Sequence, residues 1–255
     1  KMDYHAWVYR EGLQDKFAPI HSGDFVTVQK QTGIPVGIGL HDSSAALIPY
    51  QSVFPEPFVL LSTGTWSISL NPFNHSPLTE AELKQDCLCY LSFQGKPVKA
   101  SRLFAGHDHE LFVKKLAAHF QCREDRYLAL DPDPQMIERW ARAGEEEMAT
   151  VFSGAGFLNT YEASYHAGMA YLLRLQKRST ELALGNGPVK NMFVDGGFSR
   201  NRIFMQLMAL HFPQMELYAA SLAQASALGA ALSIHHHWNK ENRPAALPEL
   251  KRYTA

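Results

Sequence analysis

The sequence is poor in cysteine, in net charge and in long apolar runs. Three cysteines among 255 residues are too few, and odd in number, for a disulfide scaffold, so a reducing, cytoplasmic compartment fits best. A formal net charge of −1 offers no polybasic surface for nucleic acid or for an anionic membrane. No apolar stretch approaches the length of a membrane span, and the first residues do not resemble a signal peptide.

What the sequence does contain is enough apolar surface for a large core. Hydrophobic residues make up 46% and charged residues 19%, which are ordinary values for a globular protein. The length suggests one large domain, or one domain with a piece of another. The first residues also do not resemble a natural start, and we expect the chain to begin in the middle of a larger fold.

The hydrophobic patterns predict a hairpin and strands first, then helices, then two β-α units. This order indicates an α/β protein with a mixed sheet that helices cover on both faces. We expect strands at 36–40, 58–62, 66–70, 87–93, 191–194 and 215–219, and helices at 45–48, 99–120, 136–148, 162–184, 203–210 and 223–238. Residues 123–134 form a predicted polar loop, and the chain from 242 onward is expected to be irregular.

A glycine turn between a predicted strand and a predicted helix is the first candidate for a binding site. Asp195, Gly196 and Gly197 follow an apolar run directly. Glycine lacks a Cβ and accepts positive φ, so a flat ring or a phosphate can lie against the main chain here. Ser199 or Asn201 could cap the helix or hydrogen-bond a ligand. The alternative is a structural turn without a ligand.

Two further turns also follow predicted strands. Asp42 lies at the end of an apolar run, where a carboxylate suits a general base that takes a proton from a hydroxyl. The alternative is a helix N-cap at Asp42 or Ser43. Thr63, Gly64 and Thr65 offer hydroxyls and backbone N–H groups to phosphate oxygens, or form an ordinary hairpin turn. Because α/β proteins bind ligands at the carboxyl ends of strands, we expect the three turns to gather at one end of the sheet.

Four motifs in this order resemble the successive signatures of the FGGY carbohydrate kinases. The resemblance covers the chain from about residue 17 to about residue 236, and its motifs are Gly39-Leu40-His41-Asp42-Ser43-Ser44-Ala45, Ser62-Thr63-Gly64-Thr65-Trp66-Ser67, Asp195-Gly196-Gly197-Phe198-Ser199-Arg200-Asn201 and Ala225-Ser226-Ala227-Leu228-Gly229-Ala230-Ala231. It implies an actin-like, ribonuclease-H-like ATPase fold of two lobes with the active site between them. It also implies phosphoryl transfer from ATP, with Mg²⁺, to a hydroxyl of a sugar such as a ketose or a related polyol.

The resemblance also implies roles for particular residues. Asp42 matches the catalytic base, with His41 beside it at the substrate, and this pair is similar to members that act on deoxyketoses such as rhamnulose. The matches to the phosphate-binding turn are Ser62, Thr63, Gly64 and Thr65, and those to the adenine-side loop are Gly196, Gly197 and Asn201. No residue matches a metal ligand. A non-catalytic actin-like nucleotide-binding module, or a degenerate kinase, is the alternative.

The sequence departs from the family pattern in two ways. The first phosphate loop, the magnesium-linked aspartate and most sugar contacts belong to an N-terminal lobe that is not found here. Residues 1–34 then correspond to the end of that lobe and a hinge, 35–240 to the C-terminal nucleotide-binding lobe, and 241–255 to a C-terminal tail. The missing N-terminal lobe of the same protein is therefore an expected partner, and a homodimer is possible. Gln224 stands where the family more often has Glu, which puts details of the nucleotide side in doubt.

One run of polar residues has metal-ligating chemistry but the wrong spacing. His107, Asp108, His109 and Glu110 are consecutive, whereas helical ligand pairs usually stand at i and i+4. We therefore interpret this run as the start of a helix.

Overall fold

The computed structural model describes residues 40–185, 187–222, 224–235, 240 and 249–254. Within these ranges the chain forms two compact units. The first unit holds 40–53, 91–96, 224–235 and 240, and the second holds 54–90, 97–222 without 186, and 249–254. Of the predicted strand at 36–40, residues 36–39 lie outside the described residues.

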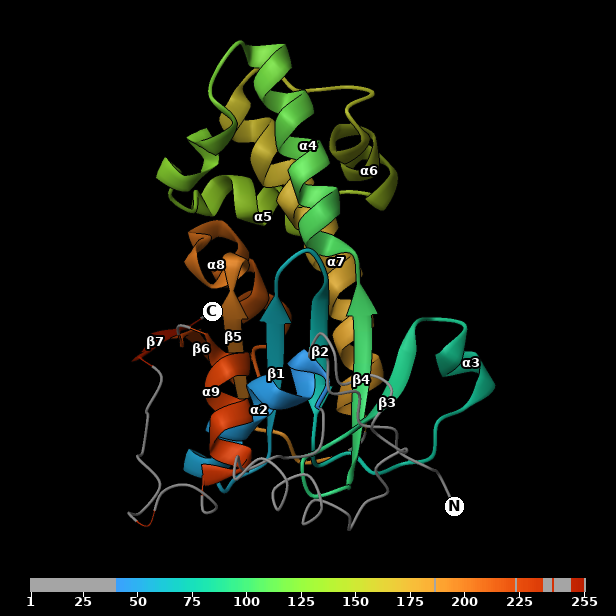
Figure 1. Ribbon diagram of the computed structural model, residues 1–255. Coiled ribbons are helices and arrows are strands. Elements are labelled where there is room, and N and C mark those ends of the chain that lie inside the picture. The colour runs from blue at the N-terminus through green and yellow to red at the C-terminus, as the bar shows by residue number, and fades with distance from the viewer. Residues whose placement is uncertain (1–39, 186, 223, 236–239, 241–248, 255) are drawn as a thin grey trace, which may run out of the picture. The chain divides into compact units, whose positions relative to one another are not determined.

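Seven strands of the described residues form one mixed sheet (Figure 1). Their bounds are β1 Phe58–Thr63, β2 Ser67–Asn71, β3 Cys87–Leu91, β4 Pro97–Leu103, β5 Asn191–Gly196, β6 Glu216–Ser221 and β7 Glu249–Tyr253. The strand order is β3-β4-β2-β1-β5-β6-β7. β1 is parallel to β5 and β5 to β6, whereas β1 with β2, β2 with β4 and β6 with β7 are antiparallel. The predicted mixed sheet is confirmed.

The central strand β1 has the sequence of a strand that is covered on both faces. Phe58, Val59, Leu60 and Leu61 are fully buried in succession, as expected where a sheet is packed on both sides. Its partner β5 contributes Phe193, whose ring centroid lies 5.5 Å from that of Phe58. The register aligns the last residues of β1 and β5, so the turns that follow these two strands emerge side by side.

The helices of the second unit lie along the sheet and beyond one end of it. They are α3 Glu80–Leu83, α4 Ala105–Phe120, α5 Pro134–Arg142, α6 Glu145–Ser153, α7 Tyr161–Leu184 and α8 Arg202–His211, with 3-10 turns η2 Glu124–Ala129 and η3 Gly197–Arg200. α7 packs against β2 and β4. Figure 1 shows α4, α5 and α6 gathered beyond the end at which β1 and β5 finish. None of the described helices combines the length and apolar character needed to cross a membrane.

A glycine allows α4 and α7 to pack closely. A Cβ at Gly168 of α7 would lie 2.3 Å from the Phe112 ring of α4, a distance that no real contact allows. Phe112 is buried, and so are Tyr165 and Trp140 in the same core. Glycine at 168 therefore serves the packing of α7 against α4.

The first unit is built on the contact of α2 Asp42–Val53 with α9 Ala225–Ser233. A Cβ at Gly229 would lie 1.8 Å from the carbonyl oxygen of Ala45, so the glycine of the alanine-rich motif permits the backbones to touch. Gln224 occupies the N-cap position of α9 with φ +56°, and its side chain makes no capping hydrogen bond.

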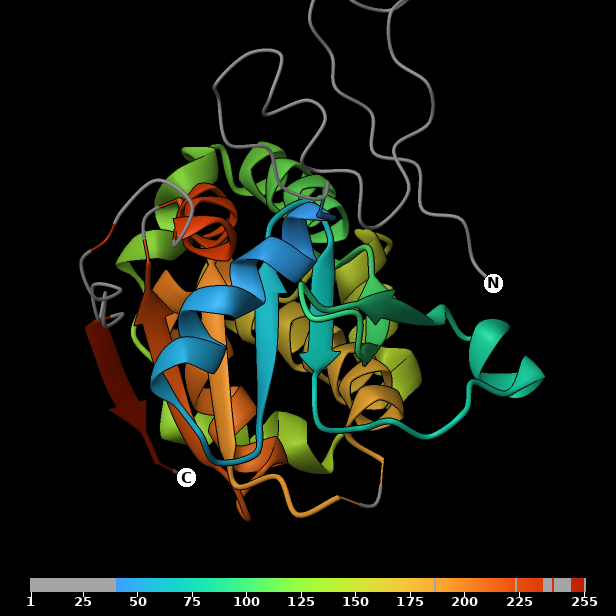
Figure 2. The same ribbon diagram turned by 60° about the horizontal axis from the view of Figure 1, so that its bottom comes forward.

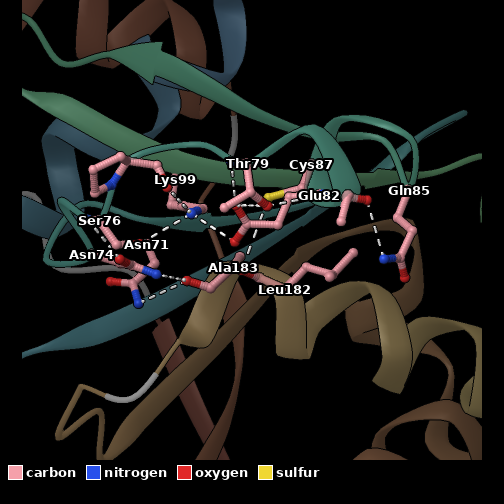
Figure 3. Close-up of polar contacts among 12 residues, drawn as sticks. Asn71, Asn74, Ser76, Thr79, Glu82, Gln85, Cys87, Lys99, Leu182 and Ala183 are labelled. Atoms are coloured by element: carbon pink, nitrogen blue, oxygen red, sulfur yellow. Dashed lines mark hydrogen bonds and ion pairs between the residues drawn. The ribbon is translucent and has the colours of Figure 1, made fainter.

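A buried ion pair fastens α3 to the sheet (Figure 3). Lys99 Nζ lies 2.7 Å from Glu82 Oε1, and only 2% of the lysine side chain is exposed. The same ammonium donates to Ser76 Oγ at 3.0 Å. Figure 2 shows α3 standing away from the sheet on the excursion between β2 and β3. Beside it, Asn71 and Asn74 donate to the Ala183 carbonyl and so satisfy the open end of α7.

Three predicted elements are wrong in part. The predicted helix at 99–120 is β4 up to Leu103 and becomes α4 only at Ala105. The predicted helix at 136–148 is two helices, because the chain is extended at Ala143 and Gly144. The predicted irregular tail contains β7, which pairs with β6. α9 ends at Ser233, and 236–238 of its predicted range lie outside the described residues.

Candidate functional site

The hairpin turn after β1 is held by the first turn of α4. Gly64 N–H donates to the Trp66 carbonyl at 2.9 Å, and His107 N–H donates to the Thr65 carbonyl at 3.1 Å. A Cβ at Gly106 would lie 1.8 Å from the Gly64 carbonyl oxygen. Only glycine at 106 therefore lets the helix start approach the turn this closely.

Thr63 joins the hairpin turn to the glycine turn that follows β5. Its hydroxyl donates to the Asp195 carbonyl at 2.6 Å and accepts from Phe198 N–H at 3.0 Å. Since the hydroxyl has one proton, that proton is already committed inside the protein. Gly196 reinforces the junction, because its φ is +92° and a Cβ there would lie 1.8 Å from the Thr63 carbonyl oxygen.

The other members of the predicted phosphate turn face different surroundings. Gly64 and Thr65 are exposed, whereas Ser62 is half-buried within β1. Among the described residues, the Thr65 hydroxyl makes no hydrogen bond. The exposed tip, Gly64 with Thr65, is therefore the part of the turn that can meet an anion.

The glycine turn after β5 resolves the two roles considered for Asn201. Its Oδ1 accepts from Phe204 N–H at 3.1 Å, which makes Asn201 the N-cap of α8. Its Nδ2 donates to the Tyr165 hydroxyl at 2.7 Å. Ser199 instead donates to the Gly196 carbonyl at 2.8 Å. Within the described residues nothing lies within 4 Å of a Cβ built on Gly197, so this glycine borders open space.

A cavity of about 360 Å³ lies where these segments of the second unit meet. Gly64, Gly106 and Gly197 bring three stretches of backbone to its wall. Tyr127 of η2 and Phe198 of η3 add aromatic surface. The volume lies within the range of small-molecule sites, which combine apolar walls with a few polar groups.

Four titratable side chains also line this cavity: His109, Glu110, Glu124 and Asp125. Burial lowers the pKa of His109 to about 4, so the ring is neutral at pH 7. The hydrogen bond from Lys114 lowers the pKa of Glu110, and that from Arg123 lowers the pKa of Asp125. Glu110 and Asp125 are therefore ionised, each paired with a basic side chain, whereas the His109 ring is neutral.

Asp42 belongs to the first unit and begins α2. Its Oδ1 accepts from Ser43 N–H at 2.6 Å and lies 2.8 Å from His41 Nδ1. The side chain is 78% exposed, and Oδ2 has no hydrogen-bond partner among the described residues. α2 begins at Asp42 itself, so neither of the caps considered, Asp42 and Ser43, precedes the helix. The His41 carbonyl accepts from Ala45 N–H at 2.9 Å. Asp42 thus keeps a solvent-facing oxygen that can accept a proton.

The second unit brings together the predicted phosphate turn and the predicted adenine-side loop around one cavity. Sequence reasoning missed His109, Tyr127 and the carboxylates of the wall. The run from His107 to Glu110 was the available signal, and its interpretation as a helix start is confirmed, since α4 begins at Ala105. Which of these side chains face a cavity depends on how η2 and η3 pack against α4.

Comparisons with known proteins agree with this architecture. A sequence model described as "Carbohydrate kinase FGGY, C-terminal domain" matches residues 55–243. None of the curated protein sequences compared with the chain matches it.

Solved structures of kinases share the fold. A carbohydrate kinase from Novosphingobium aromaticivorans is 23% identical with a TM-score of 0.55, over 85% of this chain and 48% of that one. The xylulose kinase from Rhodospirillum rubrum is 15% identical with a TM-score of 0.57, over 92% of this chain and 50% of that one. The chain thus spans about half the length of these structures. The likeness confirms the expected actin-like, ribonuclease-H-like α/β fold.

Proposed function

Because this chain belongs to the FGGY carbohydrate kinase family through its C-terminal domain, we propose that it is the nucleotide-binding lobe of a sugar kinase. The reaction is transfer of a phosphoryl group from ATP to a hydroxyl of a ketose or a related polyol. The observation that carries this proposal is the cavity at which the hairpin turn, the start of α4 and the turn after β5 meet. Bare backbone from three glycines suits a ligand with a flat ring and a phosphate tail.

The nucleotide lies in this cavity, with its base between the aromatic walls and its phosphates toward the hairpin tip. Gly197 gives the base or ribose close approach to the main chain, while Gly196 and Asn201 fix the turn that carries Gly197. Gly64 and Thr65 present an exposed tip to the phosphates. Thr63 acts by holding the two turns together, since its hydroxyl is engaged by Asp195 and Phe198.

Asp42 is the general base that takes the proton of the acceptor hydroxyl. Its exposed carboxylate has one oxygen engaged at the helix start and the other open to solvent. His41 stands beside it and contacts the sugar. Phosphoryl transfer depends chiefly on positioning and charge stabilisation, so an oriented carboxylate is what the acceptor side requires.

Mg²⁺ arrives with the nucleotide. Among the described residues, no group of three or more His, Cys, Asp or Glu side chains could hold a metal ion. Mg²⁺ commonly keeps several waters and binds through substrate phosphates with few protein ligands, so MgATP fits a site without a protein cage. The ion, when bound, neutralises phosphate charge.

We further propose that residues 35–240 form the C-terminal lobe, preceded by the end of an N-terminal lobe and a hinge at 1–34 and followed by a tail at 241–255. The N-terminal lobe of the same protein supplies the remaining sugar contacts. The length of the matched kinases, about twice that of this chain, supports this partner.

The test is an ATP-consumption screen across ketoses and polyols with the protein isolated from its native source, together with calorimetry of MgATP binding. Sugar-dependent ADP formation, with a sugar phosphate detected by mass spectrometry, is the expected result. MgATP binding without sugar-dependent turnover would instead favour a non-catalytic actin-like module or a degenerate kinase. Failure to bind any adenine nucleotide would overturn both.

A further inference from the structure

One wall of the cavity is formed by a histidine that is surrounded by aromatic rings. His109 is 7% exposed. Its ring meets Tyr127 and Phe198 edge to face, at centroid distances of 4.9 and 5.2 Å. Its one hydrogen bond among the described residues joins Nε2 to the Tyr165 hydroxyl at 2.9 Å. The ring therefore has one polar partner inside the protein, and it lines the cavity with its remaining surface.

The direction of that hydrogen bond is set by Asn201. The Asn201 amide cannot be turned over, because its Oδ1 already accepts from Phe204 N–H. Its Nδ2 therefore donates to the Tyr165 hydroxyl. Tyr165 is fully buried, and burial raises its pKa well above 10, so the hydroxyl keeps its proton. Among the described residues, the only acceptor within reach of that proton is His109 Nε2, and a buried donor left unpaired is costly.

This arrangement fixes the tautomer of His109. A neutral imidazole carries one proton, and Nε2 accepts from Tyr165, so the proton resides on Nδ1. Within the described part of the chain, Nδ1 has no hydrogen-bond partner. His109 therefore presents an N–H donor on a ring that lies against the aromatic rings of Tyr127 and Phe198.

We propose that His109 Nδ1 donates a hydrogen bond to an acceptor ring nitrogen of a purine base in this cavity, and so selects the nucleotide. Tyr165 and Asn201 are positioning residues that hold His109 in the donating tautomer. The inference rests on the proposed function, because it assigns the base-reading group of the same site. It adds a requirement on the ligand that the cavity alone does not impose. The base must carry an acceptor nitrogen at one position of its ring.

The alternative is a core histidine satisfied by a single hydrogen bond. His109 Nδ1 is not among the buried polar atoms that lack a partner, so it is accessible from the cavity. A bound base can therefore accept from Nδ1–H in place of water. Specificity then arises because a base lacking the acceptor leaves the donor unpaired.

The experiment compares MgATP with 1-deaza-, 3-deaza- and 7-deaza-ATP by calorimetry, in each of which one ring nitrogen is replaced by C–H. The unmodified protein is expected to bind one analogue about tenfold more weakly than ATP, the loss of one hydrogen bond. His109→Phe keeps the ring shape and removes the donor, so it is expected to bind ATP and that analogue equally. The control is His119→Phe, since His119 is an exposed residue of α4 outside the cavity.

A second measurement does not depend on how the variants fold. Nitrogen-15 NMR of the unmodified protein is expected to find His109 protonated at Nδ1 and unprotonated at Nε2. A proton on Nε2 would overturn the inference, as would equal binding of ATP and all three analogues. Nucleotide binding without this discrimination leaves the proposed function standing, whereas no binding of any nucleotide contradicts the proposed function itself.

Discussion

The adjacent residues Gly196 and Gly197 lack a side chain for different reasons. Gly196 has φ +92° and touches the Thr63 carbonyl, so any Cβ there is both strained and obstructed. Gly197 has open space where a Cβ would be, and it lines the cavity. The fold therefore requires glycine at position 196. At position 197 the fold does not require it, and the close approach of a ligand does.

Gly197→Leu is therefore expected to weaken MgATP binding by about tenfold or more with little change in melting temperature. Gly196→Ala is expected to lower the free energy of unfolding by about 2 kcal/mol or more, from strain and backbone collision. Calorimetry and thermal unfolding measure the two effects. Gly187→Leu is the control, because Gly187 also has open space for a side chain and does not line the cavity. Unchanged affinity in Gly197→Leu would contradict the assigned binding surface.

Asp42 allows a substitution that separates catalysis from structure. In Asp42→Asn the side-chain oxygen can still accept from Ser43 N–H, as Asp42 Oδ1 does at 2.6 Å, but an amide cannot take a proton. Turnover is expected to fall by about 10²- to 10⁴-fold, with nucleotide affinity changed less than about twofold. Steady-state kinetics and calorimetry on the native protein measure both. Equal loss of affinity and turnover would indicate a structural role at the helix start.

At the scale of elements, the attachment of α3 to β4 depends on one ion pair (Figure 3). Lys99 Nζ is buried, whereas 23% of the Glu82 side chain is exposed. Lys99 also pulls the pKa of Glu82 below its ordinary value, chiefly through their hydrogen bond. Glu82 has a second task, since its carboxylate accepts from Thr79 N–H and closes the capping box of α3. Replacing Glu82 therefore leaves a buried ammonium, whereas replacing Lys99 leaves a carboxylate that water can reach.

We expect Glu82→Gln to cost about 3 kcal/mol of unfolding free energy, because it leaves a buried ammonium without its counter-charge. Lys99→Met is expected to cost less, since the remaining carboxylate can reach water and the methionine fills the space. Urea unfolding of both variants at pH 7 measures the difference. Thr79→Ala serves as a control for the capping contribution alone. A larger loss in Lys99→Met than in Glu82→Gln would contradict this explanation.

Elements were predictable where the local sequence alone identifies them. Residues 58–61 of β1 and 192–194 of β5 are uniformly apolar. α7 lies between Thr160, which caps its start, and Gly185, which follows its end. The predicted helix at 99–120 included β4, in which Lys99 is buried beside Glu82, a pairing that the local sequence pattern does not reveal. β7 was missed because it is an edge strand whose side chains are almost all exposed, so it lacks the alternation that identifies a strand.

The residues of the candidate site that belong to local motifs were predictable, and those that tertiary packing brings to it were not. Gly64 and Gly197 belong to turns with their own sequence signatures, and both line the cavity. His109 and Tyr127 come from α4 and η2, and only tertiary packing brings them to the same wall. The tautomer of His109 depends further on Tyr165 and Asn201, which are distant in sequence. No local pattern contains that information.

For the molecule as a whole, the residues proposed to bind the nucleotide and the residue proposed to take the proton belong to different compact units. The cavity and both of its glycine turns belong to the second unit, and Asp42 belongs to the first. Each set of groups is held by contacts within its own unit. Nucleotide binding and proton abstraction are therefore expected to respond to separate sets of substitutions, as the variants of Gly197 and Asp42 test.

The free energy of unfolding is also expected to depend on pH, because burial lowers the pKa of several histidines. Burial lowers the pKa of His109 to about 4, against about 6.5 in an unfolded chain. Between these values the unfolded state binds a proton that the folded state does not, so stability decreases as the pH falls from about 6.5. The loss attributable to His109 reaches about 3 kcal/mol at pH 4 and stays constant at lower pH. Burial also lowers the pKa of His166 and His211, which adds loss of the same sign.

Urea unfolding between pH 7.5 and pH 4 measures this dependence. We expect His109→Phe to lose about 3 kcal/mol less stability than the unmodified protein over this interval, whatever the stability of the variant at neutral pH. The comparison is one of slopes, so a general destabilisation by the substitution does not obscure it. His119→Phe, which removes an exposed histidine of the same helix, should retain the full slope. Identical pH dependence in His109→Phe and the unmodified protein would contradict this explanation. It would mean that His109 takes up a proton in the folded state as readily as in the unfolded chain, although burial should lower its pKa.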